Sequence, residues 1–73
     1  MRRNRIGLKS LREQIARDLQ GKGFVPVGHI GVLLDGAGRP ELNVGRFCRG
    51  LMRRGLVERN HKGLYQRRLR VDD

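Results

Sequence analysis

Arginine is the residue with the greatest capacity for binding chemistry in this chain. The 73 residues include 14 Arg and 3 Lys against 7 Asp+Glu, which gives a net charge of +10. Arg46, Arg49 and Arg53 recur at spacings of three and four, so in a helix they would share one narrow arc. Guanidinium groups bind phosphate and guanine in a bidentate manner, so a polyanionic partner is the first class indicated. A GC-rich coding genome would account equally well for the preference for arginine over lysine.

The chain lacks the residue patterns that catalysis and metal binding need. Its carboxylates are not clustered, and no Ser lies near a His and an Asp that could form a catalytic triad with it. No glycine-rich phosphate loop with its required lysine is present. Cys48, His29 and His61 do not have a metal-ligand spacing. We therefore expect no enzyme activity, no cofactor and no metal site. One cysteine allows no internal disulfide and indicates a reducing compartment.

A helix is predicted over residues 43–54, and it positions the three arginines. Its apolar residues fall at i, i+3, i+4 and i+7, and they are Val44, Phe47, Cys48 and Leu51. The arginines lie nearly opposite this face. Asn43 is the expected N-cap, with Leu42 and Phe47 spaced as a hydrophobic staple, and Gly55 is the expected stop. A start at Pro40 is the alternative, but it would turn Leu42 toward solvent.

A basic β-hairpin is predicted after this helix, with strands over 56–59 and 64–71 around the turn 60–63. In the second strand, alternation sends Gln66, Arg68 and Arg70 outward and Tyr65, Leu69 and Val71 to the opposite face. Arg67 interrupts the inward set, so its side chain must snorkel or lie near the sheet edge. The turn residues His61 and Lys62 could reach a minor groove or a phosphate.

The first half of the chain reads as support for this unit. Residues 8–20 carry a stripe of Leu8, Leu11, Ile15 and Leu19 and are predicted helical, with Ser10 and Glu13 as a capping box if the helix starts one turn late. Residues 24–27 are expected to be extended, as an edge strand beside the hairpin, because proline interrupts them. Residues 28–34 are predicted as a short helix, with a strand as the competitor because Gly28 and Gly31 lower helix propensity.

The order helix, extended piece, helix, turn, helix, hairpin resembles the winged helix-turn-helix family. The resemblance is strongest over 44–65, where residues 47–59 (FCRGLMRRGLVER) and then Gly63-Leu64-Tyr65 look like its recognition-helix-to-wing junction. The loop 35–42 is longer than the usual turn, and the second helix is richer in glycine. The resemblance implies a small α+β fold with three helices and a C-terminal hairpin wing over residues 8–71, preceded by a flexible basic arm over 1–7.

The resemblance also implies sequence-specific binding of duplex DNA, as in a transcriptional regulator or a phage or plasmid accessory factor. Helix 43–54 would read the major groove, and the wing 56–71 would contact the backbone or minor groove. The candidate contacts are Asn43, Arg46, Arg49, Arg53, Arg54, His61, Lys62, Gln66, Arg68, Arg70, Arg2, Arg3 and Arg5. For Asn43 we favour the N-cap role over a base contact.

Two other partner classes fit the same charge. Structured RNA is one, as in ribosome-associated winged-helix proteins, and an acidic protein surface is the other. The single Tyr, two Phe and no Trp, with Phe24 and Phe47 expected to be buried, leave no stacking platform for single strands, which favours duplex DNA. No stretch reaches membrane-spanning length, so a cytoplasmic, nucleoid-associated protein is expected. A homodimer would add burial to a domain this small.

Overall fold

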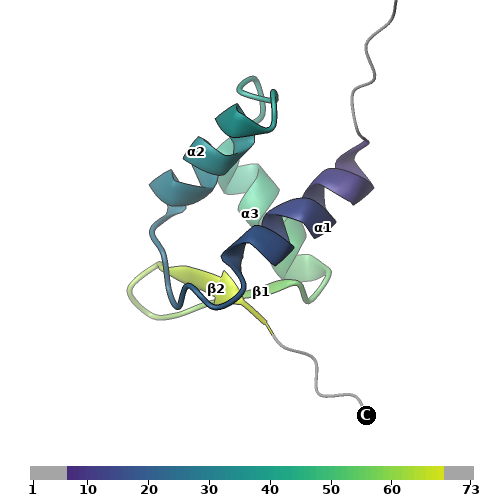
Figure 1. Cartoon of the computed structure of the whole chain (residues 1–73). Coiled ribbons are helices and arrows are strands. Elements are labelled where there is room, and N and C mark those ends of the chain that lie inside the picture. Colours follow the sequence, from purple (N-terminus) through teal and green to yellow (C-terminus); the bar gives the residue numbers. More distant parts are fainter. Residues whose placement is uncertain (1–6, 69–73) are drawn as a thin grey trace, which may run out of the picture.

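Three helices and a β-hairpin follow one another in the computed structural model, which describes residues 7–68 (Figure 1). They are α1 (Leu8–Leu19), α2 (Val27–Gly36), α3 (Val44–Arg53), β1 (Val57–Arg59) and β2 (Tyr65–Arg67). The fold is therefore a small α+β fold with the layout of a winged helix, as predicted. Part of the expected arm and residues 69–71 of the expected second strand lie outside the described residues.

Helix α1 starts one residue after Gly7, whose backbone is extended and which offers no side-chain cap. The late start with a Ser10–Glu13 capping box is wrong, because both residues already lie inside the helix. The predicted stripe is buried at Leu11, Ile15 and Leu19. Leu8 departs from it and is exposed, because it lies in the first turn, at the rim of a groove lined also by Leu42 and Phe47.

Helix α2 settles the ambiguity of the glycine-rich segment in favour of a helix. Ile30 and Leu34 are buried, and Leu33 packs against the same core. A Cβ atom built on Gly31 would lie 3.3 Å from Cγ2 of Val44. Gly31 therefore lets α2 approach α3 closely, so the residue that weakens the helix locally serves its packing.

Helix α3 begins where the sequence predicted. The Asn43 Oδ1 atom accepts a hydrogen bond from the backbone N–H of Arg46 at 2.9 Å, so Asn43 is the N-cap and the alternative start at Pro40 is wrong. Gly55, with φ of 72°, ends the helix. Its N–H donates to Met52 O at 3.0 Å and the N–H of Leu56 donates to Leu51 O at 2.9 Å, which is a Schellman motif.

The hairpin is antiparallel, with Glu58 opposite Gln66 and Arg59 opposite Tyr65. Its turn is held by Asn60, whose Oδ1 accepts from the N–H groups of Lys62 and Leu64, both at 2.9 Å. Val25 extends the sheet by one isolated bridge to Tyr65, with N···O distances of 2.7 and 2.8 Å. The extended piece before α2 therefore pairs with the hairpin as expected, but it is one residue shorter than predicted, because Val27 already begins α2.

The expectation that Phe24 is buried is wrong. Its side chain is 41% exposed, whereas Phe47 is 6% exposed. Successive residues of an extended segment face opposite sides, and Val25 takes the inward side at the bridge, so Phe24 faces solvent. Val25 joins a core formed by all three helices and both strands, which consists of Leu11, Ile15, Leu19, Val25, Ile30, Leu34, Phe47, Cys48, Leu51, Val57 and Tyr65. Within residues 7–68, no helix is long and apolar enough to cross a bilayer.

Candidate nucleic-acid interface

The outward face of α3 presents the arginines that the sequence singled out. Arg46, Arg49 and Arg53 are all exposed, whereas Phe47, Cys48 and Leu51 on the opposite face are buried. None of these arginines forms an ion pair with another described residue. Burial of the apolar face in the core fixes which side of the helix faces solvent. The three guanidinium groups on that side are therefore available to contact an external anion.

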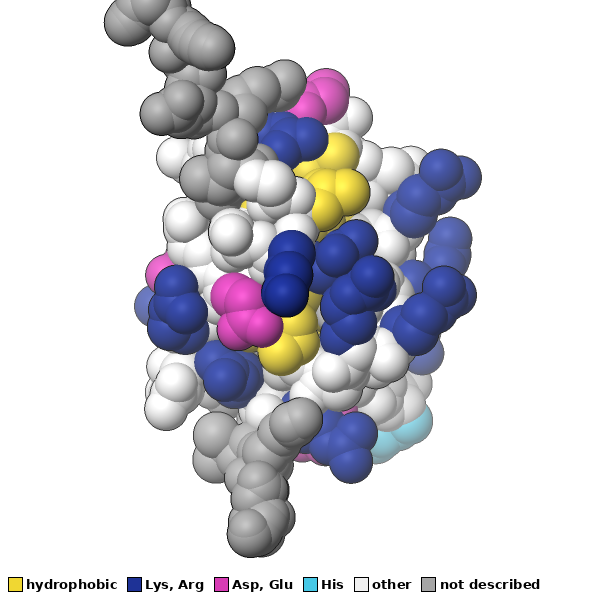
Figure 2. Space-filling view, turned by 90° about the vertical axis from the view of Figure 1, so that its right-hand side faces the viewer, with side chains coloured by type: hydrophobic (Ala, Val, Ile, Leu, Met, Phe, Trp, Pro, Cys, Tyr) yellow, Lys and Arg dark blue, Asp and Glu magenta, His cyan; other side chains and the backbone are white. Residues whose placement is uncertain are grey.

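Cationic side chains also dominate the molecular surface around this helix. In Figure 1, α3 lies at the back of the view, and in Figure 2 the Lys and Arg side chains are densest on the corresponding right-hand side. The acidic side chains visible in this view form a few separate patches, mainly at its top and left. A field of one sign over one side of a small domain attracts polyanions by long-range electrostatics.

The two ends of α3 differ in what their polar side chains do. Asn43 is exposed, but its Oδ1 is occupied as the helix cap. Arg54, the C-cap residue, turns away from the outward arginine face, and its Nη1 donates to the carbonyl of Gly50 at 3.4 Å. Arg54 therefore belongs to the side of the helix that faces α1, together with Gly50.

The hairpin places its candidate residues at two locations. His61 and Lys62 are exposed at the tip, in the turn that Asn60 holds. Gln66 lies on the outward sheet face, where its amide donates to the Glu58 carboxylate. That carboxylate adds a negative charge to the expected contact surface of the wing. Arg68 is exposed just after β2, and Arg2, Arg3, Arg5 and Arg70 lie outside the described residues.

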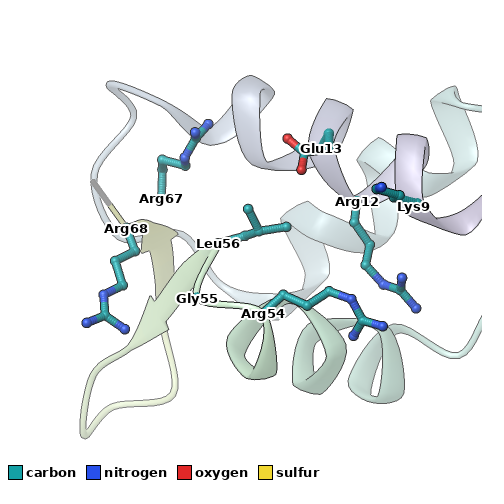
Figure 3. Close-up of a pocket in the computed structure, with 8 residues that line it drawn as sticks. All are labelled: Lys9, Arg12, Glu13, Arg54, Gly55, Leu56, Arg67 and Arg68. Carbon is teal, nitrogen blue, oxygen red and sulfur yellow. The ribbon is translucent and has the colours of Figure 1, made fainter. Parts of the chain in front are cut away.

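A cationic cleft of about 520 Å³ opens between α1, the end of α3 and the base of the hairpin (Figure 3). It is lined by Lys9, Arg12, Glu13, Arg54, Gly55, Leu56, Arg67 and Arg68. Arg12 and Arg54 extend toward the same end of the cleft, and Arg67 reaches up toward α1. Arg68 points outward from the rim. The cleft joins cations from segments that are far apart in the sequence.

Arg12 reaches α3 because Gly50 has no side chain. A Cβ atom on Gly50 would lie 3.4 Å from Arg12 Nε, so the guanidinium occupies that space. Arg12 Nε and Arg67 Nε and Nη1 are shielded from solvent and have no hydrogen-bond partner among the described residues. Burial first, and then repulsion from Arg54, lower the pKa of Arg12. The group nevertheless stays charged at neutral pH, because guanidinium does not deprotonate there.

Sequence reasoning missed Lys9, Arg12 and Arg67 as members of one site. The inward parity of Arg67 was visible in the strand pattern, but its neighbours across the cleft were not. Asn60 was also missed as the residue that orders the turn, although an Asn three residues before a Gly is a common turn signal. No three His, Cys, Asp or Glu side chains gather as metal ligands in the part of the chain that the structure describes.

In comparisons with known proteins, no family model matches the chain, and no curated protein or solved structure matches it either.

Proposed function

We propose that this protein binds duplex DNA sequence-specifically, with α3 in the major groove and the hairpin against the flanking backbone or minor groove. The observation that carries the proposal is the outward face of α3, where Arg46, Arg49 and Arg53 are exposed and free of ion pairs with other described residues. The major groove admits an α-helix, and guanidinium groups on its outward face can donate to the O6 and N7 acceptors of guanine. A regulator or a phage or plasmid accessory factor would act by occupying its site.

The positions of the charged side chains suggest separate roles for the hairpin and for α3. Exposed cations such as Lys62 and Arg68 on the hairpin and its end supply phosphate contacts, which give affinity without selectivity. Selectivity comes from α3, whose outward side chains reach base edges. One short helix reads few base pairs, so dimers or adjacent copies are expected to bind neighbouring half-sites.

The test begins with selection of bound sequences from a random duplex library, with structured RNA as competitor. Recovery of a short DNA motif supports the proposal, and exclusive recovery of the RNA overturns it. Affinity for the recovered site should then fall steeply with salt, because each neutralised phosphate contributes a slope of about −0.9 in log K against log salt.

Variants of α3 then separate base reading from charge. Arg46→Ala and Arg53→Ala should each cost about 1–3 kcal/mol on the selected site and much less on random duplex, if they contact bases. Lys22→Ala is the matched control, because Lys22 is an exposed cation in the link between α1 and α2. Equal losses on selected and random duplexes would show that the arginines contact phosphates only.

Structured RNA is the second candidate, and the exposure of Phe24 favours it. An exposed aromatic ring beside the hairpin could stack on an unpaired base. Phe24→Ala should then weaken binding of a looped RNA by about 1–3 kcal/mol and leave duplex DNA binding unchanged. An equal affinity of Phe24→Ala and the parent protein for looped RNA would remove this candidate.

A further inference from the structure

The cationic cleft between α1, the end of α3 and the hairpin base is electrostatically unbalanced. Its walls carry Lys9, Arg12, Arg54, Arg67 and Arg68 against the single carboxylate of Glu13. Within residues 7–68, Glu13 forms no ion pair with these cations. A site that holds several like charges together and leaves buried N–H groups unpaired is costly for the protein alone.

We propose that this cleft is a binding site for a phosphate group, separate from the outward face of α3. The guanidinium groups of Arg12 and Arg54 extend toward the same end of the cleft, and they are the donors that such a ligand would satisfy (Figure 3). A phosphate offers several acceptor oxygens and at least the charge of a carboxylate in one compact group, which suits two neighbouring guanidinium forks. The cleft volume of about 520 Å³ accommodates a phosphodiester or a pyrophosphate.

The packing of Arg12 shows that the site is built into the fold. Its guanidinium fills the space above Gly50, so any residue with a Cβ at position 50 would press on it at 3.4 Å. Arg54 is placed by the end of α3, and Arg67 is placed by its pairing opposite Val57. Arg12 and Arg54 are therefore held near one another by α1 and the end of α3 rather than by flexible loops, and Arg67 lines another part of the cleft (Figure 3).

The phosphate has two sources with the same chemistry. Arg12 also lines a groove that continues along α3 to Asn43 and Arg46, so the cleft adjoins the outward arginine face. The first source is the backbone of a duplex that holds α3 in its major groove, because this backbone would run along the same side of the protein. This source rests on the proposed function. A free phosphate or pyrophosphate is the other source, and it does not depend on DNA binding.

The first test uses pyrophosphate and the whole protein. Amide NMR shifts are followed during titration with sodium pyrophosphate at an ionic strength held constant with sodium chloride. We expect saturable shifts at Lys9, Arg54 and Leu56. Arg54→Ala should weaken the affinity about tenfold, as expected for loss of a charge-assisted hydrogen bond. Lys22→Ala, outside the cleft, should leave it unchanged.

Glu13→Gln is expected to strengthen pyrophosphate binding, an effect that loss of structure would not produce. It removes the acidic charge of the cleft, so it should strengthen pyrophosphate binding about threefold through reduced repulsion. Shifts spread evenly over the surface, or equal affinities for Arg54→Ala and Lys22→Ala, would overturn the site.

The second test identifies the source with duplexes that carry a single neutral methylphosphonate at successive positions. If the cleft contacts the backbone, one methylphosphonate should weaken the parent protein but not Arg54→Ala. Pyrophosphate binding without any duplex affinity would support the cleft and contradict the proposed function. Duplex binding with no pyrophosphate shifts and no effect of Arg54→Ala would overturn the cleft alone.

Discussion

Two glycines of α2 sit in different surroundings, and substituting them tests how α2 presents α3. A Cβ atom on Gly28 would meet nothing within 4 Å, whereas one on Gly31 would meet Val44 Cγ2 at 3.3 Å. Val44 opens α3 and is half-buried, and its branched side chain is restricted at χ1. The contact at Gly31 therefore fixes the spacing between the two helices.

The expected magnitudes follow from these distances. Gly28→Ala should stabilise the fold by about 0.4–1 kcal/mol, because it removes backbone freedom from the unfolded chain at no steric cost. Gly31→Ala should gain less or lose stability, because Val44 must move by a few tenths of an ångström. Gly31→Val should destabilise by about 1–3 kcal/mol through overpacking. Gly28→Val is its matched control, with the same β-branched side chain placed in open space.

The assay is thermal unfolding followed by circular dichroism. For a domain of this size, 1 kcal/mol corresponds to a shift in Tm of about 4–8 °C. Gly31→Val should therefore melt at least about 4 °C below Gly28→Val. Equal melting temperatures for the two valine variants would refute the close approach of α2 and α3 at Gly31.

Two further predictions concern α3. Asn43→Ala should destabilise by about 0.5–2 kcal/mol in urea unfolding, and Asn43→Asp should restore stability while weakening DNA binding, because it keeps the cap oxygen but adds a negative charge beside Arg46. A stability of Asn43→Ala equal to that of the parent would contradict the cap. Burial raises the pKa of the Cys48 thiol to about 11, a rise that a hydrogen bond with Tyr65 reduces. The native protein should therefore resist thiol reagents at pH 8, and its stability should fall as pH rises from the ordinary thiol pKa of 9.0 to about 11, because only the unfolded thiol ionises there. Cys48→Ala should lack this component of the fall, and fast labelling of the native thiol would contradict its burial.

The sequence predicted correctly those elements whose start, end and buried face are all determined by residues close together in the chain. Helix α3 has an apolar face, a capping asparagine and a terminating glycine between residues 43 and 55, and the structure begins and ends it accordingly. Helix α2 was ambiguous because the reason for Gly31 lies in Val44, on another helix. Phe24 was misjudged because its orientation depends on the pairing of Val25 with Tyr65, a contact between distant residues.

The candidate site also has one part that the sequence predicted and one part that it did not. The arginine face of α3 follows from helical periodicity alone, so the spacing of Arg46, Arg49 and Arg53 was enough to predict it. The cationic cleft is assembled from α1, the end of α3 and the base of the hairpin, and no period in the sequence relates Arg12 to Arg67. In the sequence, Gly50 comes closest to indicating the cleft. Its missing side chain leaves space, but only the tertiary packing shows that Arg12 fills it.

Residue 25 is hydrogen-bonded to residue 65 in both directions, and this pairing constrains how the protein folds during synthesis. While residue 65 is still inside the ribosome, the segment before α2 has no strand to pair with. The helices can form by then, but the start of α2 cannot be fixed to the sheet. Premature termination before Tyr65 would thus release a fragment in which the backbone groups of Val25 bond only to water and part of the apolar core stays uncovered.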